Sequence, residues 1–187
     1  MAGTLPTRAR AQASPAWRTL WFVIFVVVAG AIGGAAWAVF AHRPGYVITN
    51  ELGAYLTERG QADVFSSDAL FVAMAGLVGM LTGVVAWLRF RDLGWLVCLH
   101  ALLGGIAGAV IVWRLGLLVS PNNFDQRLAA AAAGDTVPID LALHSLSALL
   151  IGPFGAITPI MLCAAFWPDG ESSAQQAPEA RRVATLD

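Results

Sequence analysis

The sequence predicts an all-α protein, a four-helix transmembrane bundle with two extracytoplasmic loops that carry short interfacial helices. Of its 187 residues, 58% are hydrophobic and only 12% are charged, a composition unsuited to a water-exposed surface. Four separate apolar runs are each long enough to cross a bilayer as a helix, for which about 20 residues suffice. The tryptophans cluster at the ends of these runs, where indole rings meet lipid headgroups. A chain of this length fits one domain.

The predicted transmembrane domain covers residues 17–168. It lies between two predicted cytoplasmic tails, 1–16 and 169–187, whose Ser, Gln, Pro and charged residues favour disorder. The first apolar run is longer than the roughly 7 to 15 residues of a signal-peptide core, so we expect an uncleaved anchor. The four spans are predicted at about 20–41, 69–88, 93–113 and 141–167.

Arginine supplies all 11 basic residues and predicts the orientation. Seven arginines precede the first span, lie in the link between the second and third spans or follow the fourth span, whereas four lie among seven acidic residues in the other loops. The positive-inside rule therefore places both termini in the cytoplasm and the two long loops outside. We expect a multi-pass protein of the cell inner membrane.

The tryptophans predict the same topology without using charge. We expect two interfacial belts, because an indole ring has an apolar body and a polar N–H that favour the headgroup level. The inner belt would hold Trp17, Trp21, Trp87, Trp95 and Trp167, and the outer belt Trp37 and Trp113.

Each outer loop contains a pattern typical of a short amphipathic helix. In the first loop, apolar residues share one helical face between Asn50 and a stop at Gly60. In the second loop, the same pattern lies between Asn122 or Asn123 and Gly134. Both helices are expected to lie along the membrane surface.

Four ionisable residues are predicted to meet at the outer membrane face: Asp68, Arg114, Asp140 and His144. Arg114 is expected to pair with Asp68, because the short link makes the second and third spans run side by side. These residues have two interpretations. They are interfacial anchors and helix caps, or they bind an ion or an anionic headgroup.

His100 is predicted to lie seven residues into the third span, about 10 Å deep. An imidazole at that depth needs a partner or water, which indicates a neutral side chain bonded to a neighbouring helix or a step in a proton relay. Cys98 and Cys163 both lie in apolar runs and lack metal-ligand spacing. The sequence therefore predicts no metal site and no disulfide.

Paired glycines in the second and third spans predict close helix packing. Gly79 with Gly83, and Gly104 with Gly108, each form a GxxxG step that lets backbones approach. We expect these glycines to pack inside the chain, in an antiparallel hairpin of the second and third spans. Packing against another protein is the alternative.

Proline and glycine in the fourth span predict an irregular helix. Pro153 and Pro159 lack the backbone donor that a helix requires, so we expect a kink or a break. A static kink and a broken helix that lines a site are the two interpretations.

These features predict a non-catalytic integral membrane accessory or assembly protein. No phosphate loop, metalloprotease or hydrolase motif is present, so we expect no enzyme, no cofactor and no nucleic-acid partner. The expected partners are the lipid bilayer and another membrane protein, which would use an exposed apolar or Gly-rich face. The alternative is a small transport or lipid-handling component with a polar site at the outer face, which needs a cavity near Arg114 and His144.

Over residues 20–167 the chain resembles an actinobacterial family of small four-span membrane proteins known only as a domain of unknown function. The resemblance rests on Asp68 opening the second span, Trp87 before an Arg-rich turn, a Trp-Arg-Leu-Gly end to the third span and a Gly-Pro pair in the fourth. It implies the inner membrane of an actinobacterium and no catalytic activity.

Overall fold

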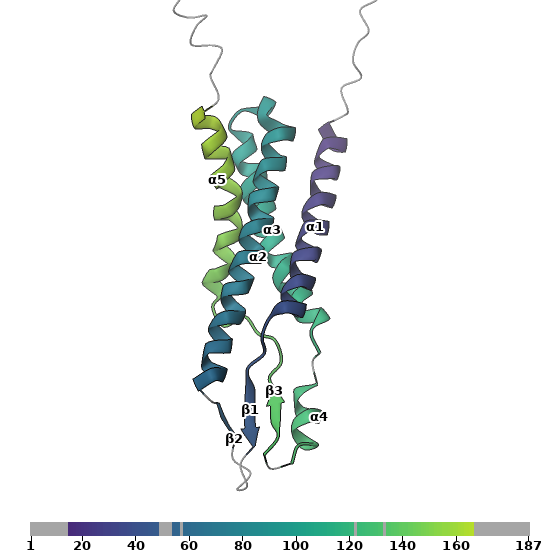
Figure 1. The fold of residues 1–187 in the computed structure, drawn as a ribbon. Coiled ribbons are helices and arrows are strands. Elements are labelled where there is room, and N and C mark those ends of the chain that lie inside the picture. The colour runs from purple at the N-terminus through teal and green to yellow at the C-terminus, as the bar shows by residue number, and fades with distance from the viewer. Residues whose placement is uncertain (1–14, 49–53, 57, 122, 133, 167–187) are drawn as a thin grey trace, which may run out of the picture.

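Four long helices form a bundle, as predicted (Figure 1). The computed structural model describes residues 15–48, 54–56, 58–121, 123–132 and 134–166. The long helices are α1 (Pro15–Phe40), α2 (Glu58–Phe90), α3 (Leu96–Val119) and α5 (Ile151–Phe166). All four chain segments are long and apolar enough to cross a bilayer, so the chain is an integral membrane protein. Apart from Pro15 and Ala16, the predicted tails lie outside the described residues, as does Trp167.

Three helices, α1, α2 and α3, are longer than the predicted spans, and α5 is shorter. Helix α2 begins at Glu58 rather than at residue 69, and its 33 residues measure about 50 Å, well beyond a hydrocarbon core of about 30 Å. Helix α3 likewise continues past residue 113 to Val119. Apolarity marks only the part of a helix in lipid, so it misses polar turns in water. The fourth span begins at the 3₁₀ helix η2 (Leu146–Leu150), not at residue 141.

Helices α2 and α3 form the predicted antiparallel hairpin and occupy the centre of the bundle. They are joined by the 3₁₀ helix η1 (Arg91–Leu93) and by Gly94, whose φ of 61° favours glycine. Helices α1 and α5 lie on opposite sides of this hairpin, and their free ends lie at the same end of the bundle (Figure 1). We call this the turn end, because it carries η1.

The opposite end, here called the sheet end, carries a small antiparallel sheet. Strands β1 (Gly45–Ile48), β2 (Ala54–Leu56) and β3 (Thr136–Pro138) have the order β2-β1-β3. Tyr46 lies opposite Leu56 on one side and opposite Val137 on the other.

The predicted helix in the first loop is therefore wrong: residues 54–56 are a strand, and 49–53 and 57 lie outside the described residues. The β-branched and aromatic residues of β1 find their partners far along the chain, which a local helical pattern does not reveal. The second predicted loop helix is confirmed as α4 (Phe124–Ala129), which ends before Gly134. The rings of Tyr46 and Phe124 lie 6.3 Å apart and join α4 to the sheet.

The apolar core includes a tryptophan that was predicted to lie in the outer belt. Trp37 is 0% exposed and its ring packs edge-on against Phe71 at 5.1 Å. A side chain at Gly116 would overlap the indole ring, so this glycine makes the space that Trp37 fills. Trp17, Trp21 and Trp95 at the turn end are exposed, as an interfacial belt requires. Trp37 differs because its N–H finds a partner inside the protein.

Helix α5 runs through Pro159 without ending there. Pro153 lies in its first turn, where the missing backbone donor costs nothing. The predicted break at Pro159 is therefore wrong, and the span has 3₁₀ geometry only before Ile151, in η2.

Candidate functional site

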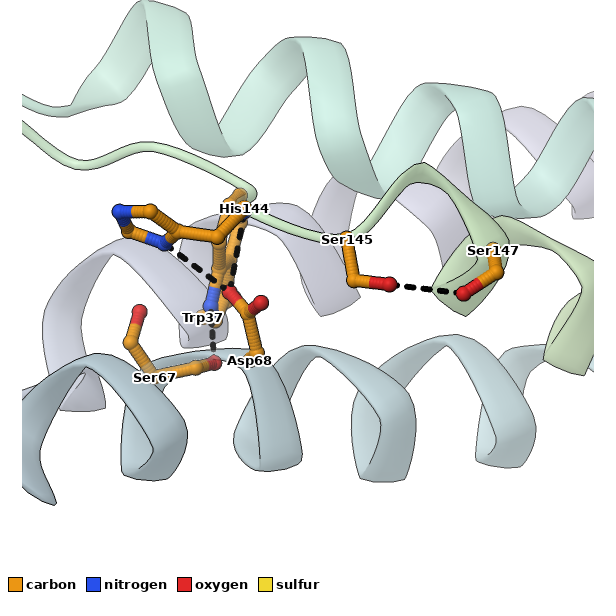
Figure 2. Close-up of polar contacts among 6 residues, drawn as sticks. All are labelled: Trp37, Ser67, Asp68, His144, Ser145 and Ser147. Atoms are coloured by element: carbon orange, nitrogen blue, oxygen red, sulfur yellow. Dashed lines mark hydrogen bonds and ion pairs between the residues drawn. The ribbon is translucent and has the colours of Figure 1, made fainter.

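Asp68 and His144, two of the four predicted polar residues, meet at the sheet end. The backbone N–H of His144 donates to Oδ1 of Asp68 at 3.3 Å, and the imidazole Nδ1 lies 3.5 Å from the same oxygen (Figure 2). The Asp68 side chain is 17% exposed, whereas that of His144 is 49% exposed. These contacts hold the segment before η2 against α2.

The carboxylate of Asp68 lies next to a rigid part of the core. Nε1 of Trp37 donates to the backbone oxygen of Ser67 at 3.0 Å, which ties α1 to α2 one residue before Asp68 (Figure 2). Ser67 itself is 2% exposed, and its hydroxyl has no partner among the described residues. Asp68 is therefore a preorganised group rather than one on a mobile loop.

A groove of about 520 Å³ opens beside Asp68, between α2 and the η2–α5 segment. Its walls are mainly apolar and include Phe65, Val72, Leu150 and Phe154. Its polar lining consists of Asp68, Ser145 and Ser147. The two serine hydroxyls lie 2.7 Å apart and share one hydrogen bond (Figure 2). We call this space the lateral groove.

A second groove of about 510 Å³ follows α5 on its α3 side. It shares Leu150 and Phe154 with the lateral groove, and it continues along the helix to Met161 and Leu162. Its lining is apolar except for Thr158, whose hydroxyl donates to the Phe154 carbonyl at 2.8 Å. This second groove therefore suits a hydrocarbon chain and not a polar ligand.

The other two predicted cluster residues lie apart from Asp68, and the predicted pair between Arg114 and Asp68 is wrong. Asp140 binds Arg127 of α4 at 2.6 Å. The guanidinium of Arg114 lies 4.5 Å from the centroid of the Trp113 ring, and no described carboxylate lies within ion-pair distance of it. The cause is helical phase: Val112 and Gly116 face the bundle, so Arg114 between them points away from α2.

His100 bonds through one ring nitrogen to its own helix, not to a neighbouring helix as predicted. Its Nδ1 lies 2.9 Å from the Leu96 carbonyl oxygen. Its ring stacks on Phe90 with centroids 4.4 Å apart. Because α3 begins at Leu96, His100 lies only one helical turn from the turn end. A proton relay across the membrane would need further polar groups beyond it.

An ion pair that was not predicted from the sequence joins α1 to η1 at the turn end. Two guanidinium nitrogens of Arg18 donate to the two carboxylate oxygens of Asp92 at 2.8 and 2.7 Å. Arg18 also lies over the Phe90 ring, 5.4 Å from its centroid. This bidentate pair fastens α1 to the α2–α3 turn.

The predicted packing glycines all lie inside the bundle. A side chain at Gly79 would overlap the Gly152 carbonyl oxygen, and one at Gly83 would overlap that of Ala156. These two glycines therefore let α5, rather than α3, approach α2 closely.

The glycines of α3 admit side chains from other helices. A Cβ at Gly104 would lie 2.8 Å from Phe22 of α1 and 2.8 Å from Thr82 of α2, and one at Gly108 would lie 3.1 Å from Val78. All four glycines thus serve packing within the chain, which confirms the internal interpretation of the GxxxG steps.

Several residues of the site were not identified from the sequence. Ser145, Ser147 and Arg127 are ordinary loop or helix residues whose partners lie elsewhere in the fold, and no spacing rule connects them. Within the described part of the chain, no three His, Cys, Asp or Glu side chains gather where they could hold a metal ion. No family model, curated protein or solved structure matches the chain, so the resemblance to the actinobacterial family stays a prediction.

Proposed function

We propose that this integral membrane protein is a non-catalytic lipid-handling component that binds a membrane lipid in the lateral groove. The observation that carries the proposal is the pairing of apolar walls with three polar lining residues, Asp68, Ser145 and Ser147, which we call the polar end of the groove. A lipid has the same division between chain and headgroup. Such a groove matches the general form of a ligand site, mainly apolar with a few placed polar groups.

The position of the groove supports a lipid rather than a water-soluble ligand. Asp68 lies near the sheet end of the apolar part of α2, at the level where headgroups meet water. Leu150 and Phe154 stand between the two grooves and are 67% and 75% exposed. A diacyl lipid with one chain on either side of these two residues would leave its headgroup beside Asp68.

The accessory or assembly function has less support. The four predicted packing glycines are used inside the bundle, so they form no face for a partner. Exposed apolar side chains occur on all four long helices, as contact with lipid requires, and thus single out no partner surface.

Filling the lateral groove should remove the bound lipid. Ala69 lines the groove and is exposed, so Ala69→Trp adds an indole ring to the space without entering the core. We expect each chain of the detergent-purified variant to retain no more than about one fifth of the lipid that the unmodified protein retains. Native mass spectrometry measures the bound lipid.

Ala107→Trp is the matched control, because Ala107 is an exposed alanine of α3 that lines neither groove. It should retain as much lipid as the unmodified protein. Equal retention by the two tryptophan variants would contradict lipid binding in the lateral groove.

We also propose that the sheet end faces outward and that both termini are cytoplasmic. Seven of the 11 arginines in the sequence lie before the first span, between the second and third spans or after the fourth, against four in or next to the two loops of the sheet end, and this bias supports the orientation. In a chain with Cys98 and Cys163 replaced by alanine, an impermeant thiol reagent added to intact cells should label Ser66→Cys but not Trp95→Cys. Both positions are exposed, at the sheet end and the turn end respectively. The reverse pattern would overturn the orientation.

A further inference from the structure

We propose that the polar end of the lateral groove selects a phospholipid whose headgroup carries a primary ammonium, such as phosphatidylethanolamine, over an anionic one such as phosphatidylglycerol. This inference rests on the proposed function, because it names the lipid that the groove binds. It follows from the negative charge at the polar end and from the hydrogen-bond donors and acceptors there that have no partner among the described residues.

Asp68 supplies the charge. Of the described residues that line the lateral groove, Asp68 alone is ionisable, so the groove has a negative end and its remaining lining is neutral. An anionic headgroup would meet this carboxylate without a lining cation to offset the repulsion. An ammonium would complement it, because opposite charges at a partly buried site attract strongly.

The carboxylate also has an oxygen free to accept. Both contacts of His144 go to Oδ1, and no described residue donates to Oδ2. The backbone N–H of His144 holds the orientation of the Asp68 carboxylate, so Oδ2 is held in place before a ligand arrives. A primary ammonium has three N–H donors and can bond to this oxygen, whereas the glycerol headgroup offers only neutral hydroxyls.

The serine pair suits the phosphate of the same headgroup. The hydroxyls of Ser145 and Ser147 share one hydrogen bond, so one of their two protons remains free to donate. A phosphate oxygen can accept that proton. The polar end thus offers an acceptor for the ammonium at Asp68 and a donor for the phosphate at the serines, in a headgroup that carries both charges.

The test compares two lipids of identical acyl chains on the full-length protein. Purified protein in detergent at pH 8 is given equal amounts of phosphatidylethanolamine and phosphatidylglycerol, and native mass spectrometry measures the retained ratio. We expect about a tenfold preference for phosphatidylethanolamine, the factor that corresponds to one charge-assisted contact. Asp68→Asn keeps the size and the acceptor for His144 but loses the charge, and should bring the ratio to about one.

Two further variants separate the functions of the polar groups. Asp125→Asn removes an exposed carboxylate of α4 outside the groove and should leave the ratio unchanged. Ser147→Ala should lower retention of both lipids by a similar factor, because both contain a phosphate. A change in the ratio with Asp125→Asn, or with Ser147→Ala alone, would overturn the assignment of the ammonium to Asp68.

The outcomes distinguish this inference from the proposed function. Equal retention of the two lipids by the unmodified protein, together with loss of both in Ala69→Trp, would overturn the headgroup selection and leave the lipid groove standing. Retention that Ala69→Trp does not reduce would overturn the groove itself. The comparison on the unmodified protein needs no variant, so the inference stays testable even if Asp68→Asn fails to fold.

Discussion

Replacing Trp37 by alanine is expected to destabilise the bundle by about 3 to 5 kcal/mol, the usual loss when a large buried aromatic side chain is removed from a core. Trp37 is fully buried, packs on Phe71 and occupies the space that Gly116 leaves open. The substitution also removes the donor to the Ser67 carbonyl oxygen, one residue before Asp68. The free energy of unfolding of the detergent-solubilised protein is the quantity to measure.

Trp95→Ala provides the control, because Trp95 is 76% exposed. Its free energy of unfolding should lie within about 0.5 kcal/mol of that of the unmodified protein, as for most surface substitutions. Trp37→Phe should fall between the two variants, since it keeps an aromatic ring but loses the hydrogen bond. If Trp37→Ala and Trp95→Ala behaved alike, Trp37 would be an interfacial residue and its assignment to the core would be wrong.

A methyl group at Gly83 should force α2 and α5 apart. A Cβ there would overlap the Ala156 carbonyl oxygen and lie 2.8 Å from Pro159 Cγ, and neither a helix backbone nor a proline ring can turn aside. Overpacking of this kind costs about 1 to 3 kcal/mol. We therefore expect Gly83→Ala to lower the free energy of unfolding by about 2 kcal/mol, measured as above.

Gly76→Ala is the matched substitution two turns earlier in the same helix. A Cβ at Gly76 would meet only Ile151 Cγ1 at 3.5 Å, an ordinary contact. Because alanine favours a helix over glycine by about 1 kcal/mol, this variant should be neutral or slightly more stable. If Gly83→Ala lowers the free energy of unfolding and Gly76→Ala raises it, close packing at Gly83 is established. A stability gain in both would show that α2 and α5 do not touch there.

The amino-acid sequence was enough to predict the four long helices, the antiparallel hairpin of α2 and α3, and that α1 and α5 have their free ends at the same end of the bundle. These features depend on apolar length and on the short link at Arg91–Leu93. Each feature can be predicted from one segment of the chain at a time. In lipid, every backbone polar group of a span must be hydrogen-bonded within its own helix, so an apolar segment of sufficient length forms a helix. The α4 helix was predicted for a similar reason, since its amphipathic pattern is continuous along the chain.

Which side chains meet depends on the packing of the helices and could not be predicted from the sequence. The sheet joins β1 with β3 across nearly a hundred residues, and Asp68 meets His144 rather than Arg114 because Arg114 turns outward from α3. Trp37 was assigned to the membrane interface from its place near a span end, yet its rotational phase on α1 puts it in the core. Contacts between helices depend on the angle of each residue around its axis and on which helices are neighbours. Neither is encoded in apolar length or net charge, and both decide where the lateral groove and the Asp68 carboxylate lie.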